Sequence, residues 1–494
     1  MDLLRWFRHR QDWPLVVVSN REPYVHEGRP GARAAGGAGG GRIRVLSPAG
    51  GLTSALQPLM LATRGTWVAW GSGSADFEMT DAGDGVLVPP DAPAYRLRRL
   101  RLSEEEARGY YVETANRALW PLCHSQLHRF SYDEAYWRVY RRVNQRFALA
   151  ALAEAAGRPA TVWLHDYHLA FASPVLRGVP GIFVHQFWHI PWPAPDILRL
   201  LPVARELLRG LLGNHLLVFQ TPRDRLNFLA GVRRYLPGAK VSAARGLVRL
   251  DGKNTVVRAH PISIDVEAYT QLAATSEVIR LAHSLRRRYR PKRGQLLLGV
   301  DRIDYTKGIP RRFAALARLL EDDPALRGRV TLLQIAPPSR STVPEYAGFE
   351  EEVVALAGEI NARFRARRWA PIALVREHWD APAIAACYGA ADICIVSPLQ
   401  DGMNLVAKEF VACQRLRPGV LVLSRFAGAA AEMKGALPVN PYDIGAMAEA
   451  IRTALKMPGE ERERRLRSMR SRLKANSIYD WMAAVFDDVA RLRR

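Results

Sequence analysis

Long hydrophobic runs are scarce in this sequence of 494 residues, and their scarcity excludes a class of protein. No apolar run approaches the roughly 20 residues that a helix needs to cross a bilayer. The first 13 residues are basic, but neither an apolar core nor a small-residue cleavage site follows them. We therefore expect neither a membrane protein nor a secreted one, and a cytoplasmic enzyme is the default class.

Cysteine and metal-ligand clusters are equally sparse. The four cysteines, Cys123, Cys387, Cys394 and Cys413, are scattered and never form a Cys-x-x-Cys pair. Cysteines in apolar surroundings act as small hydrophobic residues, so the pattern indicates neither a disulfide framework nor a zinc site. No Asp-x-Asp motif backed by histidine is evident, and we expect no metal and no cofactor.

Basic residues are present in excess: 71 Lys and Arg against 48 Asp and Glu give a formal charge of +23. Such a field attracts nucleic acid, anionic membranes or phosphorylated metabolites. Much of the excess lies in helix-like stretches, such as residues 286–288 and 462–472, where a solvated surface explains it. The aromatic residues that could serve as stacking platforms lie in other motifs, so we expect neither a nucleic-acid nor a membrane partner.

Short apolar runs recur between longer segments of helical periodicity. Strands buried on both faces of a parallel sheet have this pattern, and the alternation predicts two doubly wound α/β units with a boundary near residues 251–261. The predicted strands cover residues 15–18, 162–164, 182–184, 216–219, 296–298, 332–333, 372–375, 393–396 and 420–423.

Polar residues come after these runs, where ligands bind in open α/β sheets. They are Ser19-Asn20-Arg21, His165-Asp166-Tyr167-His168, His189, residues 301–308, Arg340 and residues 401–409.

The chain also contains a Gly-rich stretch, residues 28–51, which is typical of a mobile loop. Its end at Gly51 enters a helix-like segment, as a backbone cradle for phosphate would, although a flexible loop explains the glycines equally well.

Two of these segments suit a nucleotide diphosphate. Arg302 and Lys307 leave one buried strand and can converge on one anion, unless they are ordinary surface cations in a turn. Asp401 and Gly402 form a turn, and the amides from Met403 onward can open a helix towards an anion. Glu409 then lies about one and a half turns into that helix. The alternative is that Asp401 caps the helix and Glu409 forms an ion pair with a nearby basic side chain.

Eight ordered motifs resemble a known family over nearly the whole chain, from about Pro14. The similarity is to trehalose-6-phosphate synthase, a retaining glycosyltransferase family of GT-B fold. The motifs are Val18-Ser19-Asn20-Arg21, Gly50-Gly51-Leu52, Tyr110-Tyr111 with Leu119-Trp120-Pro121, His165-Asp166-Tyr167-His168-Leu169, His189-Ile190-Pro191-Trp192-Pro193, Arg302-Ile303-Asp304-Tyr305-Thr306-Lys307-Gly308, Pro338-Ser339-Arg340 and residues 401–409.

The resemblance implies two Rossmann-like domains facing a cleft. The acceptor domain would span residues 1–255 and the nucleotide-sugar domain residues 256–475. A final helix, residues 476–494, would cross back to the first domain. A homo-oligomer is expected, while effectors and the nucleotide base stay open.

By the same resemblance, each matching residue takes a role. The acceptor phosphate would meet Arg21, Tyr111 and Arg340, its pocket would be lined by Trp70 and Trp120, and the acceptor sugar would be oriented by Asp166. The donor would be bound by Gly51, Arg302, Lys307, Asp401, Gly402, Met403, Asn404, Leu405, Val406 and Glu409, with Arg302 and Lys307 on the diphosphate and Glu409 on the ribose. The transferred glucose would meet His189 and Asp401. For His189, Tyr111 and the two tryptophans, ordinary packing is the alternative.

The implied reaction moves glucose from a nucleotide sugar to glucose 6-phosphate with retention. In this family retention is taken to proceed by front-face attack, with the leaving diphosphate accepting the proton. Three alternatives stay open: glycerol 3-phosphate as acceptor, which the sequence Arg21-Glu22-Pro23-Tyr24 also fits; a pseudoglycosyltransferase; and a regulator that has lost catalysis. His168 favours glucose 6-phosphate. The insertion at residues 31–41 and Gln400 depart from the family pattern.

Overall fold

The structure is a computed structural model that describes the whole chain except residues 1–12, 29–42, 48–50, 341–342, 367–368 and 494. The chain forms two compact units. The first comprises Met1–His260 and Met482–Arg494, and the second comprises Pro261–Trp481. The divisions therefore fall a few residues after the positions, 256 and 476, named from the sequence.

The first unit is built on a ten-stranded sheet with the order β10-β11-β12-β9-β8-β7-β1-β4-β6-β5. The strands from β12 to β6 in this order are parallel to their neighbours, while β5, β10 and β11 pair antiparallel. Their bounds are β1 Leu15–Ser19, β4 Thr66–Trp70, β5 Gly85–Val88, β6 Tyr95–Leu100, β7 Ala160–His165, β8 Ile182–Trp188, β9 Leu216–Phe219, β10 Lys240–Ser242, β11 Leu247–Leu250 and β12 Lys253–Ala259.

The predicted central strands of this sheet are confirmed. Every residue of β1, β7, β8 and β9 is buried, because helices cover both faces of the parallel part. The antiparallel strands β5, β10 and β11 at the two ends of the sheet have mixed exposure and were not predicted.

The helices of the first unit include the long amphipathic helix α5, Glu134–Ala155, and a π-helix over Arg108–Leu119. The other α-helices are α2 Gly51–Thr63, α3 Glu104–Ala107, α4 Trp120–Cys123, α6 Ala172–Arg177, α7 Pro195–Leu198, α8 Ala204–Leu211, α9 Pro222–Tyr235 and, from Met482 onward, the C-terminal α18 Ile478–Arg493. In α18, the Phe486 ring packs edge-to-face on Trp163 of β7, and the Asp488 carboxylate lies 2.8 Å from Nε2 of His260. These contacts anchor the end of the chain on the first sheet.

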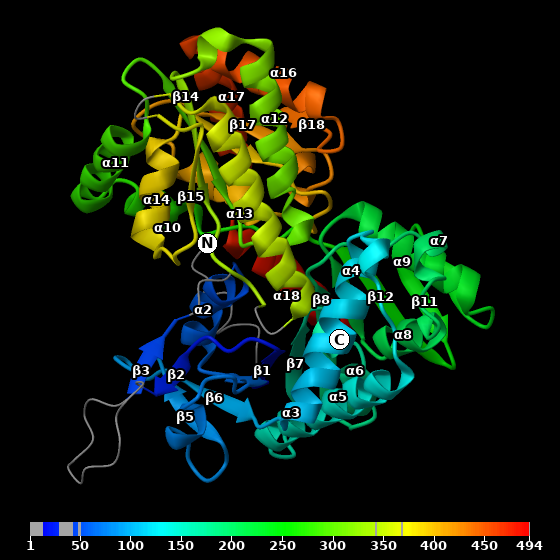
Figure 1. The fold of residues 1–494 in the computed structure, drawn as a ribbon. Helices are drawn as coiled ribbons and strands as arrows, with labels where there is room; N and C mark the ends of the chain where they lie inside the picture. Colours follow the sequence, from blue (N-terminus) through cyan, green and yellow to red (C-terminus); the bar gives the residue numbers. More distant parts are fainter. Residues whose placement is uncertain (1–12, 29–42, 48–50, 341–342, 367–368, 494) are drawn as a thin grey trace. The chain divides into compact units, whose positions relative to one another are not determined.

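The second unit has a six-stranded, fully parallel sheet with the order β15-β14-β13-β16-β17-β18. Its strands are β13 Gln295–Val300, β14 Val330–Ile335, β15 Ile372–Val375, β16 Ile393–Val396, β17 Val420–Ser424 and β18 Leu437–Val439. Its helices are α10 Val266–Leu272, α11 Ser276–Tyr289, α12 Ile309–Asp322, α13 Pro344–Phe364, α14 Ala381–Ala390, α15 Leu405–Cys413, α16 Ile444–Lys456 and α17 Gly459–Lys474. The predicted strands are confirmed, and α12 lies beside both α13 and α16 (Figure 1).

The Gly-rich stretch is only partly a loop. Its described ends form a two-stranded antiparallel ribbon of β2 (Val25–Gly28) and β3 (Ile43–Leu46), with Val25 opposite Leu46. The prediction of a loop over residues 28–51 was therefore wrong at residues 43–46. The branched residues Ile43 and Val45 favour a strand there. Gly50 and the insertion at residues 31–41 lie outside the described residues. In the described parts of the chain, no helix is long and apolar enough to cross a membrane.

Candidate active site

In the first unit, four predicted site residues lie at one edge of the sheet. Arg21 follows β1, Trp70 ends β4, Asp166 follows β7 and His189 follows β8. These four strands are consecutive neighbours and all parallel, so their carboxyl ends meet at that edge. The fold thus brings together residues that are as much as 168 positions apart, from Arg21 to His189.

A row of aromatic rings includes three of the predicted acceptor residues. The ring of Trp70 lies 5.5 Å from that of Tyr111, which stacks on His168 at 6.0 Å with an 11° angle between the planes. The π-helix carries Tyr111 to this position. Trp120 continues the same row: it is 6% exposed, and its ring lies 4.0 Å from the His124 ring and 5.7 Å from the Tyr167 ring, which in turn lies 4.0 Å from the His168 ring. Its role in the acceptor pocket stays a prediction.

The loop that presents the exposed Arg21 rests on a buried charge cluster, which the sequence did not reveal. Arg99 is 1% exposed, and its Nε donates to the Glu22 carboxylate at 2.8 Å. Its Nη2 lies 3.0 Å from Asp76. Burial, reinforced by the neighbouring Asp76, raises the pKa of Glu22 to about 8. The amide of Ser72 also donates to Glu22, at 2.9 Å, so the cluster fixes the backbone directly after Arg21.

Asp166 and His189 are linked to each other before any substrate is considered. The His189 amide donates to Oδ1 of Asp166 at 3.1 Å, and Asp166 has a left-handed backbone with φ 71°. Nε2 of His189 lies 3.0 Å from Nδ1 of His165, the last residue of β7. Burial lowers the pKa of His189 to about 3, so its ring is neutral. The sequence predicted no role for His165, and only its position at the end of a strand indicated one.

In the second unit, the two predicted diphosphate cations each have a partner. Nζ of Lys307 lies 2.6 Å from the Asp401 carboxylate, and both side chains are largely buried. Nη1 of Arg302 donates to Oγ of Ser339 at 2.8 Å, while its Nη2 lies 3.8 Å from Asp304. The two cations thus follow β13 together, as predicted, and Asp401 joins them from the segment after β16.

Arg340, predicted to meet the acceptor phosphate, is held by Asp304 in this structure. Nη1 of Arg340 lies 3.2 Å from Asp304 and also contacts the Tyr346 hydroxyl. Asp304 is fully buried, and burial alone would raise its pKa. The charges of Arg340, Arg302 and Lys307 outweigh that effect and lower the pKa to about 2. Asp304 is therefore an anionic centre for these three cations, a function that the sequence did not suggest.

The helix α15 begins at Leu405, two residues after the expected start at Met403. The residue that precedes the helix, Asn404, has φ 73° and donates from Nδ2 to Asp401 at 3.1 Å. Gly402 and Met403 are buried beside it, and the amides of Leu405 and Val406 belong to the first helical turn, which lacks internal partners. Asp401 therefore does not cap α15 in the usual way but organises the turn before it. The free amides suit an anion.

Glu409 lies in the second turn of α15, where it accepts a hydrogen bond from the buried Tyr388 hydroxyl at 2.7 Å. Burial raises the pKa of Glu409, an effect that its hydrogen bonds to Tyr388 and Tyr269 partly offset. The structure therefore does not show the alternative, in which Glu409 pairs with a basic side chain.

Gly51, predicted to bind the donor, is the exposed first residue of α2. Among the described residues, no group of three or more His, Cys, Asp or Glu is arranged to hold a metal ion.

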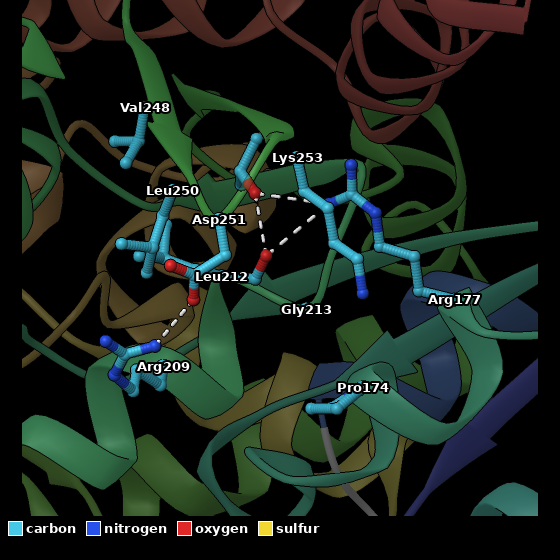
Figure 2. A pocket seen from close by; sticks show the side chains of 10 residues that line it. Pro174, Arg177, Arg209, Leu212, Gly213, Val248, Leu250, Asp251 and Lys253 are labelled. Carbon is cyan, nitrogen blue, oxygen red and sulfur yellow. Dashed lines mark hydrogen bonds and ion pairs between the residues drawn. The ribbon is translucent and has the colours of Figure 1, made fainter. Parts of the chain in front are cut away.

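A separate pocket of the first unit contains none of the predicted residues (Figure 2). It lies beside the first residues of β12 and the segment before β9, at the amino rather than the carboxyl ends of those strands. The Arg177 guanidinium donates to the carbonyls of Asn214 and Asn254, at 2.6 Å each, and Arg209 pairs with Asp251 at 2.7 Å. Arg177, Arg209 and Asp251 are therefore already engaged in contacts that hold the β11–β12 hairpin.

Comparison with known proteins gives a match over nearly the whole chain. Residues 14–491 match the model of glycosyltransferase family 20. A trehalose-6-phosphate synthase of Mycobacterium avium is 37% identical over 484 residues, which cover 96% of this chain and 95% of the relative. A bifunctional trehalose-6-phosphate synthase/phosphatase of Thermoproteus tenax is 36% identical over 94% of this chain, which spans 62% of that longer protein.

Solved structures match equally well. The Burkholderia xenovorans α,α-trehalose-phosphate synthase (UDP-forming), in complex with glucose-6-phosphate, is 34% identical with a TM-score of 0.83 over 97% of this chain and all of that one. An E. coli structure, described as trehalose-6-phosphate bound with UDP-2-fluoro glucose, is 33% identical with a TM-score of 0.83 over 97% of this chain and 99% of its own. Both matches extend through the two units, and they share the α/β fold with two mostly parallel sheets.

Proposed function

The chain belongs to glycosyltransferase family 20, and we propose on that premise that it transfers glucose from UDP-glucose to glucose 6-phosphate, releasing UDP and trehalose 6-phosphate. The observation that carries this proposal is the full-length similarity to synthases whose solved structures hold glucose-6-phosphate or a UDP-glucose analogue. The predicted site residues at the strand ends of both sheets support it.

The donor is assigned to the second unit. Arg302 and Lys307 bind the diphosphate, the first-turn amides of α15 add hydrogen bonds to the same anion, and Glu409 accepts from the ribose hydroxyls. Asp401 accepts from a glucose hydroxyl. Lys307 and Asp401 already lie 2.6 Å apart, so one side chain can contact the diphosphate while the other contacts the sugar attached to it.

The acceptor is assigned mainly to the first unit. Arg21 and Tyr111 bind its phosphate, since a guanidinium offers forked donors and a phenol one hydroxyl. Trp70 and Trp120 line the pocket, Asp166 orients the sugar, and His189 contacts the transferred glucose. Arg340 also contributes to the phosphate site. It either breaks its ion pair with Asp304 or keeps that pair while it contacts the phosphate.

The reaction replaces one bond at the anomeric carbon. The acceptor hydroxyl oxygen forms a bond to that carbon on the face from which the diphosphate oxygen departs with its electron pair. The proton of the acceptor hydroxyl passes to that leaving oxygen. Arg302 and Lys307 stabilise the negative charge that develops on the diphosphate, which is the largest electrostatic demand of the step.

The proposal is tested with purified protein and a matrix of substrates. UDP-, ADP- and GDP-glucose are each combined with glucose 6-phosphate or glycerol 3-phosphate, with and without a chelator of divalent ions, and nucleotide release and product anomer are measured. We expect fastest turnover with UDP-glucose and glucose 6-phosphate, an α-linked product and no effect of the chelator. Transfer to glycerol 3-phosphate alone would establish the other acceptor, and no transfer at all would overturn the proposal.

Two further expectations belong to this proposal. We expect a homo-oligomer, which sedimentation of the purified chain would test. A cytoplasmic location fits the four cysteines, all of which are free and buried. It is testable by fractionating cells that express the protein.

A further inference from the structure

Two histidine rings meet at the carboxyl ends of the neighbouring strands β7 and β8. Nδ1 of His165 lies 3.0 Å from Nε2 of His189, and the ring centroids are 5.3 Å apart with 32° between the planes. The short nitrogen–nitrogen distance between widely separated centroids shows that the rings meet edge to edge through one hydrogen bond.

That hydrogen bond fixes where the protons lie. Burial lowers the pKa of both rings, and for His165 the neighbouring His189 and His185 lower it further, so both are neutral at physiological pH. One neutral imidazole has one protonated and one bare nitrogen. Either His165 donates from Nδ1 and leaves His189 protonated on Nδ1, or His189 donates from Nε2 and leaves His165 protonated on Nε2.

The second nitrogen of His165 decides between these two arrangements. Nε2 of His165 is buried and has no hydrogen-bond partner among the described residues. Its ring lies 4.5 Å from that of Trp163, which also stacks on His185 at 5.2 Å. A buried N–H without an acceptor is rarer and costlier than a bare acceptor nitrogen. The proton of His165 therefore belongs on Nδ1, where it has an acceptor.

We propose that His165 is a positioning residue that holds His189 in the tautomer protonated on Nδ1, from which His189 donates a hydrogen bond to a hydroxyl of the transferred glucose. The contact with glucose rests on the proposed function, whereas the tautomer does not. The backbone of His189 is fixed independently by its amide bond to Asp166. His165 thus controls the chemical state of the ring rather than its place in the chain.

The tautomer is tested in the substrate-free protein by nitrogen NMR with labelled histidine. The chain has 12 histidines, and the His165→Asn and His189→Gln variants assign the two resonance sets. We expect the Nδ1 of His189 to have the chemical shift of a protonated nitrogen and its Nε2 that of a bare one. The reverse pattern, or an equal mixture, would overturn the assignment whether or not the protein transfers glucose.

Kinetics test the consequence with three variants. His165→Asn keeps an amide N–H close to the place of Nδ1, His165→Phe removes it, and His185→Phe is the matched control. His185 stacks on the same Trp163, and neither of its ring nitrogens has a partner among the described residues. We expect kcat/KM for UDP-glucose to fall about tenfold in His165→Phe, as for one lost hydrogen bond, and to stay within about threefold in the other two. An equal loss in all three variants would mean a packing role and overturn the proposal.

Donor analogues separate the proposal from the function on which it rests. UDP-glucose derivatives that each lack one hydroxyl are compared in the wild type and in His165→Phe. We expect one derivative to lose activity in the wild type and to lose about tenfold less in the variant. If the wild type transfers glucose but no derivative shows this coupling, the contact with glucose is overturned. If the wild type transfers no glucose, the proposed function is wrong. The NMR experiment then still shows whether His189 is protonated on Nδ1.

Discussion

The two units fix their candidate site groups by different physical means. In the first unit, ring stacking and hydrogen bonds hold most of the groups: Tyr111 stacks on His168, and His189 bonds to His165 and Asp166. The exception is the loop of Arg21, which rests on the buried charge cluster of Glu22, Arg99 and Asp76. In the second unit, charge pairs hold them, with Lys307 on Asp401 and Arg340 on Asp304.

This difference has consequences for ligand binding. A neutral ring that is already oriented can hydrogen-bond a sugar hydroxyl without giving up a charged partner. A cation that is paired with a carboxylate must exchange or share that partner when a phosphate arrives, and a half-buried pair that loses one member leaves the other charge uncompensated. We therefore expect substitutions in the second unit to affect turnover more strongly than those in the first.

The largest effect is expected from Arg302→Ala. If Arg302 stabilises the charge that develops on the leaving diphosphate, kcat falls by about two to three orders of magnitude, as for loss of an oxyanion donor. Steady-state kinetics with UDP-glucose measures it. Arg318→Ala is the matched control, because Arg318 lies exposed on α12 and pairs only with Asp322 among the described residues. An unchanged kcat in Arg302→Ala would remove this residue from the mechanism.

Asp401→Asn should separate sugar contact from diphosphate contact. The amide no longer neutralises Lys307 and accepts more weakly from glucose, so kcat/KM should fall about ten- to a hundredfold. Binding of the product UDP, measured by calorimetry, should stay equal or become tighter, because Lys307 is then available to phosphate. Weaker UDP binding would contradict the exchange of partners described above.

The neutral histidines of the first unit predict a pH dependence of stability. Burial lowers the pKa of His185 to about 3. Between pH 6.5 and 3 the unfolded chain binds a proton there that the folded chain does not, so stability falls as the pH falls, by about 1.4 kcal/mol per pH unit for this group.

His185→Phe should remove that contribution and leave those of His165 and His189. Urea unfolding at pH 7, 6 and 5 measures the slope. We expect the variant to gain stability relative to the wild type as the pH decreases. A constant difference between the two proteins across this range would mean that His185 titrates normally in the folded state.

The smallest effect is expected from Tyr388→Phe. The variant loses the hydrogen bond to Glu409, the proposed ribose acceptor, so KM for UDP-glucose should rise about fivefold with kcat unchanged. A donor that lacks the ribose hydroxyls should bind wild type and variant alike. Equal losses with both donors would show that Tyr388 acts through packing instead.

Most of the parallel strands could be predicted because burial on both faces produces continuous apolar runs, as in Val16-Val17-Val18. The strand β6 was missed because its exposure alternates and its sequence, Tyr95–Leu100, carries three arginines. The segments after the predicted strands also supplied most of the candidate site residues, since parallel strands end at one edge.

The sequence by itself determined the family, the two α/β sheets and the residues that follow each strand, because these depend on local apolar patterns and on motifs within a few residues. Only the tertiary structure decided which charged side chains form ion pairs and which histidine rings are joined by a hydrogen bond. Asp304 with Arg340, Glu22 with Arg99 and His165 with His189 are separated by 36, 77 and 24 positions. Burial and hydrogen bonding between such distant residues set their protonation and orientation, and no local pattern records them.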